Sequence, residues 1–159
     1  MNSKHLDPFL KAVELVLSQI GISDIKKGSI QVKEEMYVDK DITAFIGIVG
    51  EIKGNVSYSF DSQTAMKIAS AMMMGMPVTQ LNEIERSALA ELANMITGNA
   101  VGGLTDVKDI DITPPSVIMG QDIFFVIGTV STLTISIETS VGSIEVNFGL
   151  ETQDNCLGN

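Results

Sequence analysis

The longest helical pattern in this sequence is LNEIERSALAELANMITGNAVGG, which spans residues 81–103. Asn82 is typical of a helix N-cap, and the glycines at 102 and 103 are typical of a helix end. At about 100° per residue, the apolar side chains of this stretch fall on one broad arc, made by Ile84, Ala88, Leu89, Leu92, Met95 and Ile96. The pattern predicts a long amphipathic helix with this arc buried against a sheet.

The opposite face of this predicted helix carries a narrow polar stripe. Its members, spaced i, i+4, i+7 and i+11, are Ser87, Glu91, Asn94 and Gly98. This spacing places Glu91 and Asn94 side by side, while Ser87, Ala90 and Gly98 leave low relief around them. An amphipathic helix has a polar face without any function, but Asn is a poor helix former. We therefore interpret the stripe as a surface that another protein approaches closely, with Glu91 and Asn94 expected to be exposed.

Shorter elements are predicted on both sides of this helix. Asp7 and Pro8 are typical of an N-cap and first helical residue, and that helix should end at Gly21. Alternating apolar residues then predict three strands before Phe60, and Asp61 or Ser62 begins a second helix that runs to about Met74. Residues 105–115 are expected to be mostly a loop. Further strands are expected at 117–119, 123–126, 130–137 and 144–148.

The two halves of the chain are similar in order and spacing. Glu14 precedes Gly21 by seven residues, and Glu91 precedes Gly98 by seven. The later strands also match, since Gly54, Val56 and Phe60 correspond to Gly142, Ile144 and Phe148. The sequence therefore predicts an α/β (α+β) fold with a pseudo-symmetric duplication of helix plus strands, over about 8–60 and 82–149. We expect one domain over residues 1–151, followed by a polar tail at 152–159.

Composition excludes several classes of function. The 159 residues carry 10 basic and 20 acidic side chains, a net charge of −10, so a nucleic-acid surface is not expected. No apolar stretch approaches the ~20 residues that a bilayer requires, and a cytoplasmic location is expected. His5 is the single histidine, expected to be a solvated terminal residue, and neither a metal-ligand cluster nor a phosphate loop is present. The chemistry must therefore need few groups.

The pattern Ser87-x3-Glu91-x2-Asn94 resembles the active-site signature of the CheC/CheX/FliY family of bacterial chemotaxis phosphatases. The order of elements, the Met-rich end of the second helix and the segment Asp111–Pro115 extend the resemblance over roughly residues 5–151. The first helix has Glu14 but Leu17 where the motif needs Asn, which resembles the one-site CheX branch. The proline that the family pattern places downstream is Pro114 or Pro115, at a shorter gap than usual.

The resemblance implies a hydrolase that removes the aspartyl phosphate from a CheY-type response-regulator receiver in chemotaxis. Asn94 would orient the attacking water, and Glu91 would contact a receiver lysine. Ser87, Ala90 and Gly98 would be partner-binding positions. The chain would bind no metal or cofactor of its own, because the receiver supplies magnesium.

Two alternatives remain open from the residues. The same helix face would serve a noncatalytic module that binds or scaffolds a receiver. A structural dimer with only a strand edge as its interface is also compatible with the alternating strands. The resemblance itself implies a homodimer formed through the sheet, although the sequence does not identify the strand.

Overall fold

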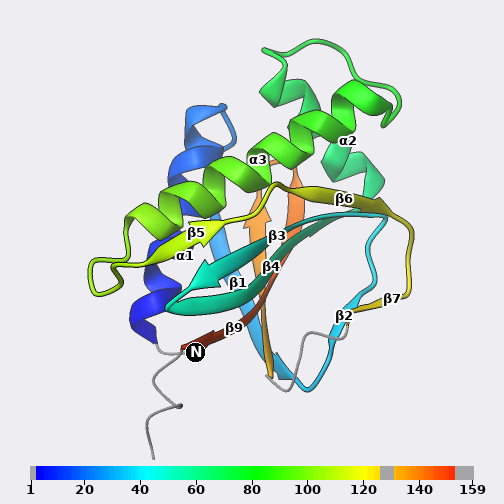
Figure 1. The fold of residues 1–159 in the computed structure, drawn as a ribbon. Helices are drawn as coiled ribbons and strands as arrows, with labels where there is room; N and C mark the ends of the chain where they lie inside the picture. The colour runs from blue at the N-terminus through cyan, green and yellow to red at the C-terminus, as the bar shows by residue number, and fades with distance from the viewer. Residues whose placement is uncertain (1–2, 126–130, 153–159) are drawn as a thin grey trace, which may run out of the picture.

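The computed structural model describes residues 3–125 and 131–152, and Figure 1 shows their arrangement. Over these residues there are three helices, α1 (Ser3–Gln19), α2 (Ser62–Met72) and α3 (Glu83–Gly102). The strands are β1 (Lys26–Lys33), β2 (Met36–Val38), β3 (Ile42–Gly50), β4 (Ile52–Phe60), β5 (Ile110–Ile112), β6 (Ser116–Met119), β7 (Ile123–Phe125), β8 (Thr132–Thr139) and β9 (Gly142–Thr152).

Seven of these strands form one antiparallel sheet. Its order is β1-β8-β9-β4-β3-β5, and β6 pairs with the other end of β3. The remaining two strands, β2 and β7, pair with each other as a separate small sheet. Helix α3 lies across one face of the large sheet beside α1 (Figure 1). The predicted α+β class, with a long helix against a sheet, is confirmed.

The two central strands pair in a register related by a two-fold rotation. On β4 and β9, Val56 lies opposite Phe148 and Phe60 lies opposite Ile144. Because the sequence matches Val56 with Ile144 and Phe60 with Phe148, a two-fold rotation exchanges these two pairs. Tyr58 lies opposite Val146, at the centre of this arrangement. The register is the one expected if each half contributes an equivalent hairpin.

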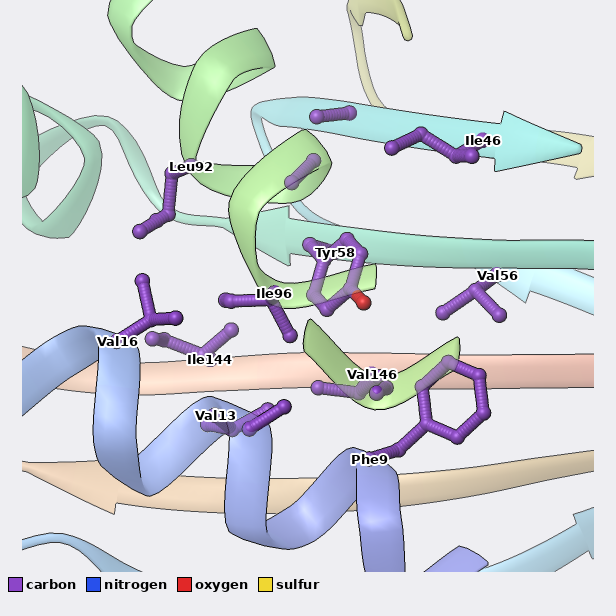
Figure 2. Close-up of a cluster of buried hydrophobic side chains, with 14 of the residues drawn as sticks. Phe9, Val13, Val16, Ile46, Val56, Tyr58, Leu92, Ile96, Ile144 and Val146 are labelled. Carbon is purple, nitrogen blue, oxygen red and sulfur yellow. The ribbon is translucent and has the colours of Figure 1, made fainter. Parts of the chain in front are cut away.

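The core lies between this sheet and the helices. Figure 2 shows Phe9, Val13 and Val16 of α1 and Leu92 and Ile96 of α3 clustered with the side chains of the central strands, among them Tyr58, Ile144 and Val146. The ring of Phe9 packs edge-on against Phe148, with ring centroids 5.2 Å apart. Alternation along β4 explains this layer, since Val56, Tyr58 and Phe60 share one face of the strand.

The other face of the sheet carries a buried polar network. Thr43 and Ser59 lie on adjacent strands with their hydroxyl oxygens 2.9 Å apart. Thr134 donates to the Asn147 amide oxygen at 2.6 Å, and the Asn147 amide nitrogen donates to the Ser57 hydroxyl at 3.2 Å. Each of these buried groups therefore has a partner, which avoids the cost of an unpaired polar atom.

The start of the first helix differs from the prediction. Helix α1 begins at Ser3, so Asp7 and Pro8 lie inside it. The first turn is held by His5, which is only 7% exposed and whose Nε2 lies 3.3 Å from Oδ2 of Asp106. The expectation that His5 is solvated is wrong. The contact of His5 with Asp106, in the segment after α3, holds the residues that precede Pro8 in the helix.

Helix α2 is capped from a distance. Asp61 occupies the N-cap position but makes no side-chain capping bond. Instead, the carboxylate of Asp41 accepts hydrogen bonds from the Ser62 backbone nitrogen at 2.7 Å and from the Ser62 hydroxyl at 2.9 Å. These bonds, together with one from Gln121, lower the pKa of Asp41 below its ordinary value.

Strand boundaries also differ in places. Four strands, rather than three, precede Phe60, because β2 pairs with distant β7. The segment 105–115, predicted to be mostly loop, contains β5 on the edge of β3. Helix α2 ends at Met72 instead of Met74, and β9 is longer than 144–148. Residues 126 and 130 of two predicted strands, and the tail beyond Thr152, lie outside the described residues.

Candidate active site on helix α3

Helix α3 is fixed to the centre of the sheet by a buried hydrogen bond. The hydroxyl oxygens of Tyr58 on β4 and Thr97 on α3 lie 2.9 Å apart, and neither residue is more than 1% exposed. Burial raises the pKa of the Tyr58 hydroxyl well above its ordinary value. Thr97 comes three residues after Asn94, so this bond also sets the direction in which the site stripe faces.

The buried face of α3 is rotated relative to the predicted arc. Its fully buried members are Leu89, Leu92, Ala93, Ile96, Thr97 and Ala100. Leu92 and Ile96 are buried as predicted, but Met95 is only partly buried and Ile84 is 68% exposed. The small residues Ala93, Thr97 and Ala100 allow the helix to approach α1 and the sheet closely. Close packing therefore favours their side of the helix over the one with the larger apolar residues.

The two predicted catalytic residues lie on the outer face of α3. Glu91 is exposed and Asn94 is partly exposed. Within the described residues, neither side chain has a hydrogen bond or an ion pair. Asn99 on the same helix differs, because its amide nitrogen donates to the Met95 carbonyl at 2.8 Å. The Asn94 amide is therefore available to an incoming molecule, whereas the Asn99 amide is bound to its own helix.

The residues around this pair are small and leave the surface open. Ser87 and Gly98 are exposed and Ala90 is partly exposed. A Cβ atom at Gly98 would meet only the Ile112 Cδ1 atom, at 4.0 Å. Packing within this chain therefore does not require glycine there, although a mid-helix glycine costs about 1 kcal/mol relative to alanine. A partner that approaches the helix backbone would account for it.

Helix α1 does not provide a second copy of this site. Its buried residues Phe9, Ala12, Val13, Val16 and Leu17 have the same spacing as the buried residues Leu89, Leu92, Ala93, Ile96 and Thr97 on α3. By burial, Asn94 therefore corresponds to Glu14 and Glu91 to Lys11, which differs from the predicted match of Glu14 with Glu91. Neither alignment places a Glu and Asn pair on α1. Among the described helices, the Glu and Asn pair is therefore found on α3 and not on α1.

The segment after α3 returns beside the site. Strands β5 and β6 pair along the same edge of β3, and α3 packs against both. The two strands are separated by Pro114 and Pro115. Proline has no backbone N–H group to donate, but at this break between strands no hydrogen bond within the sheet is lost. Thr113 holds this break to β3, since its hydroxyl accepts from the Gly47 backbone nitrogen at 2.8 Å. Ile112 places β5 under Gly98, a neighbour that the sequence pattern did not indicate.

Over residues 3–125 and 131–152, no three His, Cys, Asp or Glu side chains are grouped so as to hold a metal ion. None of the helices in this same part of the chain has the length and apolar character needed to cross a bilayer.

Comparison with known proteins assigns the fold and the site helix to one family. The family model described as chemotaxis phosphatase CheX matches residues 42–138, which include all of α3. The chain belongs to the CheX family. It is 38% identical over 125 residues to the CheY-P phosphatase CheX of Thermotoga maritima, covering 77% of this chain and 80% of that protein. The predicted family and its phosphatase activity are confirmed.

Solved structures agree with this assignment. A chemotaxis protein CheX from Desulfovibrio desulfuricans superimposes with a TM-score of 0.80 at 31% identity, covering 92% of this chain and 99% of that one. A CheC-like protein from Shewanella gives a TM-score of 0.84 at 25% identity, covering 95% and 99%. In the CheX-CheY-BeF3-Mg²⁺ complex from Borrelia burgdorferi, the matching chain gives 0.78 at 24% identity and covers 92% and 97%, which shows the shared fold.

Proposed function

We propose that this CheX-family phosphatase hydrolyses the aspartyl phosphate of a CheY-type receiver domain, using the face of α3 that carries Glu91 and Asn94. The observation that carries the proposal is the pair of exposed or partly exposed polar side chains with no partner within the described residues. The relative from Thermotoga maritima is a CheY-P phosphatase, and a protein of the same fold forms a complex with CheY.

Asn94 is proposed to position the attacking water. Its side-chain carbonyl would accept a hydrogen bond from the water. This bond would hold a lone pair of the water oxygen in line with the phosphorus atom. The water oxygen then forms a bond to phosphorus as the bond from phosphorus to the aspartyl oxygen breaks. The electron pair of the broken bond stays on the aspartyl oxygen, which leaves as a free carboxylate. The water's protons remain on the inorganic phosphate that forms or pass to solvent. A neutral amide suits this task because it enters a phosphate-rich pocket without charge repulsion.

Glu91 is proposed to align the two proteins. It lies three residues from Asn94, so on a helix their Cβ atoms are about 5–6 Å apart. A carboxylate at this distance would pair with a lysine of the receiver's phosphorylation site and fix the register of the helix. Ser87, Ala90 and Gly98 would contact the receiver, since their small side chains let its backbone come close.

Magnesium is proposed to belong to the receiver. In the described part of this chain, no three His, Cys, Asp or Glu side chains lie together so that they could hold a metal ion. When bound at the receiver, the ion would stabilise negative charge on the transferring phosphoryl group. The contribution of this chain would be the positioned water and the contact of Glu91.

A homodimer through the sheet is a further proposal, and β1 is its candidate edge. All but one residue of this edge strand are exposed, including Val32 at 73% and Ile30 at 47%. An exposed strand edge with apolar side chains is a template for pairing with another chain. The same strand carries three lysines, Lys26, Lys27 and Lys33. Their like charges would repel in any register that placed them opposite lysines of the second copy.

Decay of a phosphorylated receiver tests the phosphatase proposal against a noncatalytic scaffold. The receiver is labelled with radioactive phosphate on its aspartate, and this protein is added at one molecule per hundred receivers with magnesium present. A phosphatase accelerates release of inorganic phosphate through many turnovers. A scaffold leaves the lifetime of the phosphate unchanged at this ratio, and that result would contradict the proposal.

A further inference from the structure

The N-terminal end of α3 exposes large apolar side chains. Ile84 in the first turn of α3 is 68% exposed. In the connection that leads from α2 into α3, Met74 is 97% exposed and Met76 is 59% exposed. We call Met74, Met76 and Ile84 the apolar end of α3. Single exposed apolar residues are normal on a protein surface, but three in one connection and the adjoining helical turn point to an interaction surface.

Ile84 continues the site stripe by one more step. It lies seven residues before Glu91, which on an α-helix is a rotation difference of only ~20° and a rise of ~10 Å. Asn94 lies ten residues from Ile84, at a rise of ~15 Å. A typical protein partner covers roughly 800 Å², which is a disc of roughly 16 Å radius. A partner centred on Asn94 therefore reaches Ile84.

Charge on this part of α3 does not attract an acidic partner. Glu83 and Glu85 flank Ile84, and the whole chain has a net charge of −10. The Arg86 side chain bonds within this chain, since its Nη1 donates to the Leu81 carbonyl at 3.2 Å and lies 3.8 Å from the Met119 sulfur. A receiver's phosphorylation pocket is itself acidic and carries a phosphate. Apolar contact would supply affinity that does not depend on attraction between opposite charges.

We propose that the apolar end of α3 docks an apolar surface of the receiver beside its phosphoaspartate pocket, which is an inference that rests on the proposed function. Methionine side chains suit this role because they are flexible and polarisable, and they adapt to an uneven partner surface. The receiver is the favoured occupant because Ile84 lies on the same face of α3 as Glu91, and the two methionines lie in the connection that leads into this helix. Docking here would orient the receiver before Asn94 reaches the phosphate.

Binding to a stable phosphoreceiver analogue tests this proposal. The receiver is loaded with beryllofluoride and Mg²⁺, and its Kd is measured for wild type, Ile84→Gln and the double variant Met74→Gln with Met76→Gln. Val49→Thr is the matched control, because Val49 is 49% exposed but lies on the face of β3 away from the helices. Glutamine favours helix at position 84, so this variant retains the fold.

We expect Ile84→Gln to raise Kd about tenfold and the methionine pair to raise it further, while Val49→Thr binds like wild type. The rate of phosphate release at saturating protein should stay within about twofold of wild type, because Asn94 is unchanged. A wild-type Kd for both apolar-end variants would overturn the inference and leave the proposed function intact. If these variants instead change only the oligomeric state by light scattering, the apolar end contacts a second copy and the inference is wrong. If wild type itself binds no loaded receiver, the proposed function fails as well.

Discussion

The hydroxyl oxygen of Tyr58 lies 2.9 Å from that of Thr97, in a part of the core where both residues are inaccessible to solvent. Tyr58 is at the centre of the β4–β9 pairing, and Thr97 is less than one helical turn after Asn94. This one bond therefore connects the centre of the sheet to the rotation of the helix that carries the site. Turning α3 about its axis to expose Thr97 would break it.

Removing one hydroxyl of this pair should lower the free energy of unfolding, and removing both should lower it by less than the two single losses added together. Tyr58→Phe or Thr97→Val alone leaves a buried hydroxyl without its partner, and we expect each to lower the free energy of unfolding by about 1–3 kcal/mol. The double variant leaves no unpaired group there. Its loss, measured by urea unfolding, should be smaller than the sum of the single losses. Additive losses would show that the two hydroxyls do not interact.

Gly98 is predicted to lower the stability of α3 while it leaves room for the receiver. Because a Cβ at this position meets nothing closer than 4.0 Å, Gly98→Ala should raise the free energy of unfolding by about 0.5–1 kcal/mol. Gly98→Leu should fold but obstruct the receiver and raise Kd for the beryllofluoride-loaded receiver at least tenfold. Thermal unfolding and binding titration measure the two effects. Unchanged binding by Gly98→Leu would mean that the receiver does not approach this part of α3.

The remote cap of α2 should make stability depend on pH in the acid range. Hydrogen bonds from Ser62 and Gln121 lower the pKa of Asp41 in the folded state. Its stabilising contribution is therefore fully present above the unfolded pKa and is lost as the pH falls through the lower folded value. Asp41→Ala should cost about 1 kcal/mol at pH 7, as for the loss of a helix cap.

The difference between wild type and Asp41→Ala should shrink as the pH falls below about 4, because the wild-type carboxylate then protonates too. Asp41→Asn is the control, since an amide caps a helix without titrating in this range. Urea unfolding at a series of pH values measures all three proteins. A difference that stays constant down to pH 2 would disprove the role of the Asp41 charge.

Glu91 should contribute chiefly to holding the complex. Glu91→Ala removes the proposed charge-assisted contact with a receiver lysine, so Kd for the loaded receiver should rise by roughly ten- to a hundredfold, and kcat/KM should fall with it. Glu91 is exposed, so the melting temperature should change little. Glu83→Ala on the same helix is the control. If Glu91→Ala binds normally and loses only turnover, Glu91 acts in the chemical step instead.

Much of the site was predictable from sequence because it depends on local helix geometry. The spacing of Ser87, Glu91 and Asn94 predicts a common face whatever α3 packs against. The rotation of the buried arc was not predictable in the same way. Close contact of small residues with α1, and the bond from Thr97 to Tyr58, outweigh the larger apolar side chains of Ile84 and Met95.

Contacts between distant segments account for the other differences. The extension of α1 past Pro8 depends on the pairing of His5 with Asp106, which are 101 residues apart. The cap of α2 comes from Asp41 on the other side of a hairpin. Strand β5 is short and exists because it pairs with the end of β3. None of these partners is adjacent in sequence, so a local pattern does not reveal them.

The rate of phosphate release by Asn94→Ala, under single-turnover conditions with the protein saturating over the phosphorylated receiver, tests the central claim most directly. Asn99→Ala is the matched control, because the Asn99 amide is bound to the Met95 carbonyl within the same helix. We predict that Asn94→Ala binds the loaded receiver with wild-type Kd but releases phosphate at least about a hundredfold more slowly, while Asn99→Ala retains the wild-type rate. Phosphate release by Asn94→Ala at the wild-type rate would contradict the proposed mechanism.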